Sequence, residues 1–293
     1  MSRRNDLRTL AELVRAPAAL SVPGDVIAGA AAAGWPFGRR RTAGLAASSV
    51  LLYWAGMALN DYADREIDAK ERPHRPIPSG RIAPRTALRI AGGLTAAGLL
   101  GATAAGGRRA LATSAPLAAG IWAYDLVFKG TPAGAASMAL ARAMNVLAGA
   151  GPGGLRAAGP AAAVTAAHTM TLMALSAKEV DGSDPGLPAV TMAATAAVGT
   201  AAALLPGRSR RVPDRAAAAA MAAGYVGLFG KAQAKAVAKP SAKNLQKAVG
   251  AGIMSLIPLQ AALAAKSGAL RAGAPLLAAL PIGRALAKKV ATT

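Results

Sequence analysis

The sequence predicts an all-α fold, a polytopic transmembrane bundle of about nine helices. Of the 293 residues 54% are hydrophobic, and the mean hydropathy is +0.36. Charged residues make up 16% of the chain, whereas a soluble domain carries about 25%. Long stretches of Ala, Gly, Leu and Val alternate with short clusters of Arg and Lys. Several of these stretches reach the roughly 20 apolar residues that a helix needs to cross a bilayer.

A soluble bundle rich in alanine is the competing interpretation, because alanine is the best former of soluble helices. Such a bundle should carry a polar stripe at helical spacing. Segments 43–59 and 110–122 are apolar on every side, so neither offers a face to water. The pattern therefore favours a membrane-embedded chain.

Apolar windows bounded by Pro, Gly or charged residues define the expected elements in order. Residues 1–17 predict a cytoplasmic amphipathic lead-in, 18–265 the transmembrane domain, and 266–293 a basic interfacial segment. The expected spans are 18–36, 43–60, 86–105, 111–128, 133–151, 160–177, 188–206, 216–231 and 248–265.

The distribution of basic residues predicts a multi-pass protein of the cytoplasmic (plasma) membrane with its N-terminus inside. That orientation places the basic segments 62–85 and 231–247 inside, as the positive-inside rule prefers. It also places the basic clusters 39–41 and 208–215 outside, against the same rule. An odd number of spans puts the two termini on opposite sides.

The net charge of +21 indicates membrane lipid as a partner and not nucleic acid. Basic residues between apolar segments meet anionic headgroups, and no zinc-ligand or recognition motif accompanies them. The chain contains no cysteine, so neither a disulfide nor a thiolate nucleophile is available. The sequence leaves the oligomeric state open.

One acidic segment closes the second expected span and reads Asn60-Asp61-Tyr62-Ala63-Asp64-Arg65-Glu66-Ile67-Asp68. At the helical angle per residue, Asp61, Asp64 and Asp68 fall within about 60° of one another. Carboxylates so close repel unless a cation neutralises them. Oxygen ligands that are few and partly open suit Mg²⁺, which commonly shares its coordination with substrate phosphates. The segment predicts a Mg²⁺ site at the membrane edge.

A loop rich in proline and arginine follows, from Arg72 to Arg81. Its prolines and Gly80 exclude a regular helix and predict a compact turn. Arg72 and Arg75 could reach back over the carboxylates, where guanidinium groups suit phosphate oxygens. The expected site thus combines carboxylates, metal, diphosphate and arginine.

Asn60 to Asp68, with Arg75-Pro76-Ile77-Pro78-Ser79-Gly80 after it, resembles the first aspartate-rich motif and loop of the UbiA superfamily of intramembrane prenyltransferases. The resemblance is tight over about 25 residues. It implies nine transmembrane helices around a central cavity. Within the superfamily the chain looks most like the UbiA-like EboC branch, supported by Tyr124 to Lys129 and by the segment 246–260.

The resemblance implies a Mg²⁺-dependent enzyme that transfers an isoprenoid from its diphosphate to a lipophilic acceptor within the membrane. Asp61, Asp64 and Asp68 would be catalytic, and together with Asn60 they would bind Mg²⁺ and the diphosphate. Arg72 or Arg75, with the metal, would stabilise the leaving pyrophosphate.

The superfamily has a second aspartate-rich motif after the sixth helix, and this chain departs from it. Glu179, Asp181 and Asp184 are spaced two and three apart, where the family has three and four. Gly182 predicts a loop. The three acids are expected to bind a second Mg²⁺ in a different geometry, with Lys178 beside them contacting substrate.

Four further residues are expected to bind substrate. The fourth helix of the family often ends in Tyr-x-x-x-Lys, but here Tyr124 and Lys129 are five apart. Such a pair does not share an α-helical face well, which weighs against one of the two contacts. Arg142 and Asn145 share a face in the fifth span, where a charged residue is a functional candidate. Asp25 is weighed as a residue lining the acceptor side.

Two other function classes compete with the enzyme. A UbiA-like protein could bind or move an isoprenoid-linked molecule without transferring the chain, and the irregular second motif favours that alternative. Diphosphate release distinguishes the two. A transporter would predict inverted repeats with broken helices, and the sequence shows no internal repeat.

Overall fold

The structure, a computed structural model, describes residues 3–281, and within that range it is helical without a β-strand. The helices are α1 (Arg3–Leu13), α2 (Pro23–Ala32), α3 (Gly38–Ala63), α4 (Arg65–Glu71), α5 (Pro84–Ala123), α6 (Gly134–Ala150), α7 (Leu155–Ser176), α8 (Gly186–Leu204), α9 (Val212–Ala238), α10 (Ala242–Lys266) and α11 (Leu270–Gly273). Between or after them lie the 3₁₀ segments η1 (Ala16–Ser21), η3 (Pro152–Gly154) and η4 (Ala274–Ala278), and the π-helical turn η2 (Tyr124–Phe128). The predicted all-α class is confirmed.

Helix α5 contains two of the expected spans, because the chain reverses at Gly107. The backbone there is not helical, with φ 64° and ψ −156°. Segment 98–101 lies against 48–52 of α3 in the opposite sense, and segment 121–125 lies against 56–60 in the same sense. The chain thus runs back along α3 before the break and forward along it afterwards. A glycine is needed here because L side chains rarely adopt this backbone conformation.

The first expected span, 18–36, is wrong in its helical extent. Pro23 begins α2, a position where its missing N–H costs nothing, and the helix ends at Ala32 before Gly34 with φ 76°. Ten residues cover only about 15 Å, half the thickness of a hydrocarbon core. The short helix is instead surrounded by others, and it packs against α3, α6, α7 and α10.

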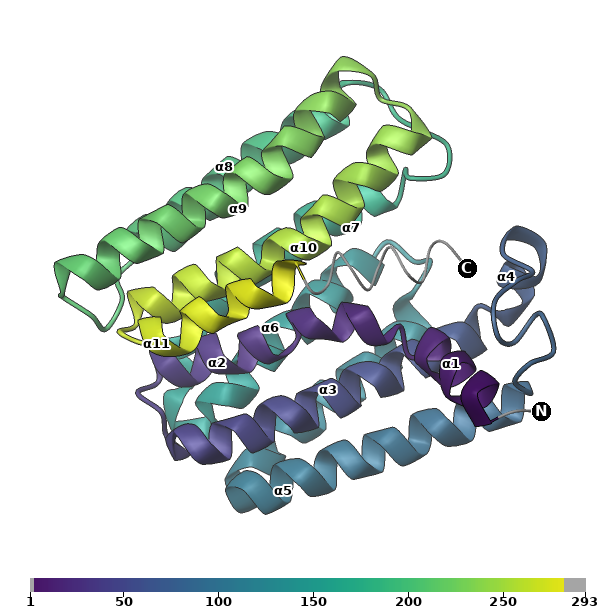
Figure 1. Cartoon of the computed structure of the whole chain (residues 1–293), viewed down its shortest axis with the longest axis horizontal. Helices are drawn as coiled ribbons and strands as arrows, with labels where there is room; N and C mark the ends of the chain where they lie inside the picture. The colour runs from purple at the N-terminus through teal and green to yellow at the C-terminus, as the bar shows by residue number, and fades with distance from the viewer. Residues whose placement is uncertain (1–2, 282–293) are drawn as a thin grey trace.

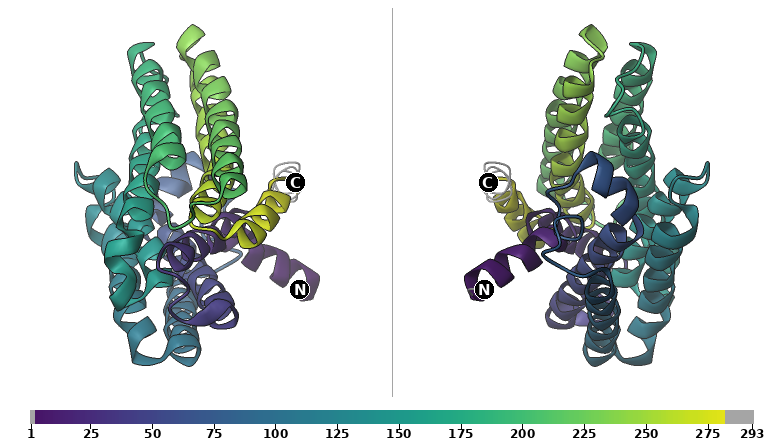
Figure 2. Two further views of the ribbon diagram at one scale, coloured as in Figure 1. Left: turned by 90° about the vertical axis from the view of Figure 1, so that its left-hand side faces the viewer. Right: turned by 90° about the vertical axis from the view of Figure 1, so that its right-hand side faces the viewer.

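Figure 1 shows the helices side by side, from α5 and α3 at the bottom to α8 and α9 at the top, with α2 and α6 between them. The end at the right carries α4, the C-terminal end of α3 and the turn between α9 and α10. The right panel of Figure 2 looks onto this end, where α4 and the loop after it face the viewer. Both basic segments predicted to lie inside, 62–85 and 231–247, are at this end.

Two glycines allow α2 and α6 to cross at backbone contact. A Cβ on Gly29 would lie 1.8 Å from the carbonyl oxygen of Val146, and one on Gly149 would lie 2.0 Å from that of Val26. The crossing separates the half of the bundle that holds α3 and α5 from the half built by α7 to α10.

Gly149→Ala should therefore destabilise the protein by about 1–3 kcal/mol, because the added methyl group forces the helices apart. Thermal unfolding in detergent measures the change. Gly92→Ala is the matched control, since a Cβ at this position of α5 meets nothing within 4 Å. Alanine there should be neutral or stabilising by up to about 1 kcal/mol, as in any helix interior. Equal effects of the two substitutions would contradict the crossing.

The N-terminal lead-in is fixed to the rest of the fold. Leu13, at the end of α1, is fully buried in a cluster with Leu59, Ile77 and Ile82. Glu12 forms an ion pair of 2.5 Å with Arg81, which lies in the loop after α4. At the other end of the chain, α11 and η4 fall within the expected interfacial segment 266–293, and residues 282–293 of that segment lie outside the described residues.

Candidate functional site

The acidic motif lies where α3 passes into α4. Asn60 and Asp61 belong to the last turn of α3, Asp64 joins the two helices, and Asp68 is in the first turn of α4. Asp61 and Asp68 are 3% and 2% exposed. Carboxylates this buried need partners, and each finds a cationic one.

Arg75 joins the two buried carboxylates. Its Nη1 lies 3.2 Å from Oδ1 of Asp61 and 2.7 Å from Oδ2 of Asp68. The guanidinium group of Arg72, the other arginine expected at the site, lies 3.9 Å from the Asp68 carboxylate and makes no hydrogen bond to that carboxylate. The loop thus reaches back over the acids as predicted, mainly through Arg75.

Arg15 is a site residue that the sequence analysis missed. Its Nη2 donates to Oδ1 of Asn60 and to Oδ1 of Asp61, each at 3.0 Å. It is also one of two residues other than glycine with positive φ within residues 3–281, at 45°. A non-glycine residue held in this conformation is strained, and such strain clusters at functional sites. The lead-in therefore contributes a guanidinium group to the acidic motif.

A π-helical turn brings Tyr124 and Lys129 to the same end of the cavity, although a pair five apart shares no face of an α-helix. The backbone N–H of Lys129 donates to the Tyr124 carbonyl at 2.8 Å, an i→i+5 bond. In this wider turn residues five apart are neighbours. Lys129 pairs with Asp64, and Tyr124 is buried beside the cavity described next.

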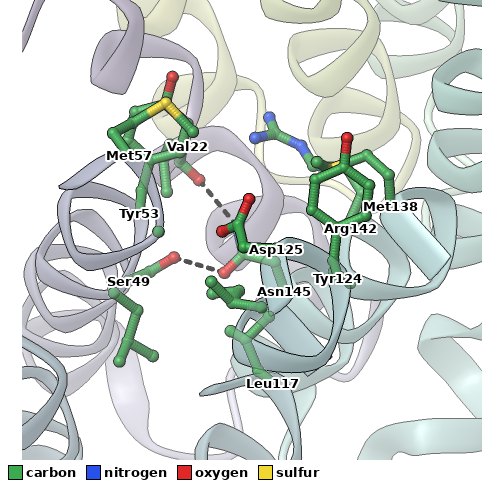
Figure 3. Close-up of a pocket in the computed structure, with 14 residues that line it drawn as sticks. Val22, Ser49, Tyr53, Met57, Leu117, Tyr124, Asp125, Met138, Arg142 and Asn145 are labelled. Atoms are coloured by element: carbon green, nitrogen blue, oxygen red, sulfur yellow. Dashed lines mark hydrogen bonds between the residues drawn. The ribbon is translucent and has the colours of Figure 1, made fainter. Parts of the chain in front are cut away.

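Asp125 connects the acidic motif to an open cavity of about 600 Å³, counting its mouth. Its Oδ1 accepts a 3.0 Å hydrogen bond from Nδ2 of Asn60. Asp125 itself lines the cavity, together with Val22 and residues of α3, α5 and α6 (Figure 3). In the sequence Asp125 is marked only as part of the stretch Tyr124 to Lys129 that carries the family resemblance. Asp125 and Asn60 are 65 positions apart, so no sequence pattern near either residue indicates that they are in contact.

One face of α3 forms a wall of this cavity and leads to the acidic motif. Ser49, Leu52, Tyr53, Gly56 and Met57 line it at helical spacing, and Asn60 continues the same stripe. Met138 and Leu117 contribute further apolar surface (Figure 3). The wall is thus apolar along most of its length and polar at the end that meets Asn60.

Arg142 and Asn145 also line the cavity, as polar groups on α6. Below them Asp25, fully buried, lies 2.9 Å from Nε of Arg142 and accepts a 2.9 Å hydrogen bond from Asn145. The angle at Nε falls outside hydrogen-bond geometry, so that contact is an ion pair. Asp25 also accepts a 2.6 Å bond from Gln260 of α10. Asp25 therefore fixes Arg142 and Asn145, which line the cavity, and does not itself line the acceptor side, because it is fully buried.

The second acidic motif folds as a turn that packs on the α9–α10 connection. The backbone N–H of Ser183 donates to Pro240, and Oδ1 of Asp184 caps the first turn of α8 through Gly186 at 2.7 Å. Lys178, Asp181 and Asp184 are exposed, and Glu179 is half-buried. Within residues 3–281 none of the four forms an ion pair. The turn lies at the same end of the bundle as α4 (Figure 1).

The donor set of the first motif fits Mg²⁺. Side-chain oxygens of Asn60, Asp61 and Asp68 accept hydrogen bonds from the guanidinium groups of Arg15 and Arg75. The same oxygens therefore already surround positive charge. Mg²⁺ takes such oxygens, one or two carboxylates at a time, and completes its shell with waters and substrate phosphates. In the described part of the chain no three acidic or histidine side chains could hold a metal by themselves. The fit is thus to an ion shared with a phosphate ligand.

An apolar cavity that ends at buried acids and arginines defines a class of helical protein able to hold an anionic head group and an apolar chain together. By length and composition, four of the described helical segments could cross a membrane: Gly38–Ala63, Pro84–Phe128, Gly186–Leu204 and Ala242–Lys266. The chain belongs to the UbiA prenyltransferase family, whose family model matches residues 22–286. It is an integral membrane protein. The predicted family is confirmed, and the narrower EboC branch stays a prediction.

Curated relatives match parts of the chain. Digeranylgeranylglyceryl phosphate synthase from Natronomonas pharaonis is 35% identical over 175 residues, 59% of this chain and 61% of the relative. The synthase of the same name from Methanopyrus kandleri is 47% identical over 77 residues, 26% of this chain and 28% of the relative. The aligned segments thus span less than two thirds of the length of these relatives.

Solved structures share the fold. The apo structure of a UbiA homologue from Aeropyrum pernix K1 has a TM-score of 0.60 and 21% identity, and covers 84% of this chain and 96% of its own. A UbiA homologue from Archaeoglobus fulgidus bound to GPP and Mg²⁺ has a TM-score of 0.57 and 13% identity, and covers 87% and 99%. At these identities the likeness is one of fold.

Proposed function

We propose that this protein is a Mg²⁺-dependent prenyltransferase that moves an isoprenoid from its diphosphate to a lipophilic acceptor inside the membrane. The observation that carries the proposal is the hydrogen bond from Asn60 to Asp125. It places the charged acidic motif at one end of an apolar cavity. A prenyl diphosphate has the same division, an anionic head and an apolar chain. Membership of the UbiA family supports the same substrate class.

In this proposal the head group binds at Asn60, Asp61, Asp64 and Asp68, which would hold Mg²⁺ with it. Bound Mg²⁺ supplies Lewis-acid stabilisation of the leaving diphosphate. Arg15 and Arg75 would turn from the carboxylates to the phosphate oxygens, since guanidinium groups bind both in the same way. Lys129 and Tyr124 would flank the head group, and Arg72 would add positive charge at its outer edge.

The isoprenoid chain would lie along the α3 face between Met57 and Leu52. When the bond between C1 and the diphosphate oxygen breaks, the electron pair leaves with the diphosphate. The acceptor then bonds to C1 and loses a proton. Asp125, between Asn60 and the cavity, is the carboxylate placed to take that proton. Arg142 and Asn145 would orient the polar part of the acceptor from the cavity floor.

The second motif has a separate place in the proposal. Glu179, Asp181 and Asp184 would bind a second Mg²⁺, with Lys178 contacting the diphosphate, after the turn closes toward α4. The shared end of the bundle supports this role. The exposed positions of Asp181 and Asp184 favour the alternative in which the protein binds an isoprenoid-linked molecule without transferring it.

We also propose that the site end faces the cytoplasm and that the membrane is the plasma membrane. Both basic segments, 62–85 and 231–247, lie at that end, which the positive-inside rule favours. Residues 1–17 would then be a cytoplasmic lead-in to the transmembrane domain 18–265, and the interfacial segment 266–293 would begin on the other side.

Pyrophosphate release tests the proposed function. Purified protein in lipid is given Mg²⁺ and geranyl, farnesyl or geranylgeranyl diphosphate, together with a membrane extract that supplies acceptors. We expect release with at least one of the three diphosphates, and loss of release in Asp64→Ala. Binding of all three diphosphates without release from any would support the non-catalytic alternative.

A further inference from the structure

A second cavity, of about 700 Å³ counting its mouth, lies at the opposite end of the bundle from Asp61. The ends of α2, α8 and α10 and the start of α7 surround it. Its walls are apolar, with Ala161, Ala202 and Leu263 at the floor and Pro160 near the mouth. None of these residues belongs to the site described above.

Lys266 places a charge in this apolar cavity. It is 8% exposed and is the last residue of α10. Its ammonium group donates to the carbonyl of Ala203, near the end of α8. An ammonium group has three donors, so two remain. Within residues 3–281 Lys266 has no carboxylate partner, and Asp214 in the adjacent segment accepts instead from Ser209 at 2.5 Å.

Arg208 adds a second cation at the mouth of the same cavity. Its guanidinium group lies against Gly34, where a Cβ would be 3.0 Å from Cζ. The segment is also fixed at Ser209, whose N–H donates to the Lys266 carbonyl at 3.2 Å. Arg208 forms no ion pair in the described part of the chain. Two cations thus line a cavity that holds no acid.

A structural role alone would have Lys266 cap the end of α8 and extend toward the interface. That role uses one donor, and it does not explain a cavity beside the ammonium or a second cation across it. An unpaired charge among apolar groups at a helix end is costly unless an anion accompanies it. Lysine and arginine side chains make strong, charge-assisted hydrogen bonds to phosphate oxygens such as those of a lipid head group.

We propose that this cavity binds an anionic membrane lipid, with the phosphate of its head group between Lys266 and Arg208. The phosphate accepts from the two free Lys266 donors and from the Arg208 guanidinium. One acyl chain lies over the apolar mouth at Pro160 and Leu205. The site is independent of prenyl transfer, because it lies at the other end of the bundle.

Native mass spectrometry of protein transferred from mixed phosphatidylglycerol and phosphatidylcholine vesicles tests this site. We expect the wild type to retain one phosphatidylglycerol in preference to phosphatidylcholine. Lys266→Met with Arg208→Gln should weaken that retention by roughly tenfold or more, the loss expected for each charge-assisted hydrogen bond. Equal retention by wild type and variant would overturn the proposal.

The matched control is Arg210→Gln with Arg271→Gln, which removes two exposed charges near the same end and none from the cavity. Phosphatidylglycerol should stay bound in this control, and its loss there would overturn the site. If inorganic phosphate displaces the lipid at equal concentration, the cavity takes a small anion and the lipid assignment is wrong. Should Lys266→Met not fold, Arg208→Gln alone still lowers retention if the site is real.

Discussion

Asp61→Asn should lower Mg²⁺-dependent prenyl transfer by about 10²- to 10³-fold, the usual cost of removing one preorganised electrostatic group. Both Arg15 and Arg75 contact the carboxylate of Asp61. This carboxylate is buried next to Asn60, where the acidic motif meets the cavity. Asparagine keeps the shape and removes the charge that the metal and both arginines require. Initial rates of pyrophosphate release and of product formation measure the effect.

Glu66→Gln is the control for this substitution. Glu66 lies in the same helix-end segment, its side chain is 83% exposed, and its ion pair is with its neighbour Arg65. Its loss should leave the rate within about twofold, as surface ion pairs contribute little. Comparable rates for Asp61→Asn and wild type, in protein of unchanged melting temperature, would place the diphosphate elsewhere.

The same assay separates the two acidic motifs. The double variant Asp181→Ala, Asp184→Ala should weaken turnover strongly if the second motif holds a metal during the reaction. Within residues 3–281 the side chains of Asp181 and Asp184 make one hydrogen bond, the cap of Asp184 on α8. Folding should therefore be affected by no more than about 1–2 kcal/mol. Unchanged kinetics would reduce this segment to a surface turn.

Arg142→Met should destabilise the protein by about 3–5 kcal/mol, the largest effect that we expect on stability. The substitution leaves the fully buried Asp25 carboxyl without a cationic partner, with only amide donors from Asn145 and Gln260. It also removes the 3.0 Å bond from Arg142 to the Ser21 carbonyl. Thermal unfolding in detergent should show a fall in melting temperature on the order of 10 °C.

Combining Arg142→Met with Asp25→Asn tests the cause of that loss. The double variant has neither the Arg142 cation nor the unpaired Asp25 carboxyl, so it should be more stable than Arg142→Met alone. Recovery remains partial because Asn145 and Gln260 donate to different oxygens of Asp25, and asparagine has an oxygen at only one of those two positions. A double variant that is no more stable than the single one would show that packing, and not charge, governs this position.

The sequence predicted those features that depend on near neighbours along the chain. Apolar stretches mark the helices because a bilayer imposes the same requirement on each one, and all nine expected spans contain helix in the structure. The first acidic motif was readable because Asp61, Asp64 and Asp68 share a helical face by spacing alone. The loop after it was predicted to turn back by its prolines, and Arg75 does contact the acids.

Tertiary structure decided what the motif contacts. Arg15 reaches Asp61 across 46 positions, and Asn60 reaches Asp125 across 65. No local pattern encodes such pairs, because they depend on how α1 and the second half of α5 pack against α3. The π-helical turn was equally hidden: a spacing of five suggests opposite faces until the backbone widens at Tyr124.

By itself, then, the sequence determined the helical class, the order of the apolar helices and the place of the acidic motif, since each is set by local hydrophobicity and helical period. Only the folded chain decided that Asp25 is a buried partner of Arg142, that the cavity meets Asn60, and that Lys266 shares a cavity with Arg208. These arrangements arise from contacts between helices distant in sequence. Burial then selects which polar groups must pair, because an unpaired one is costly.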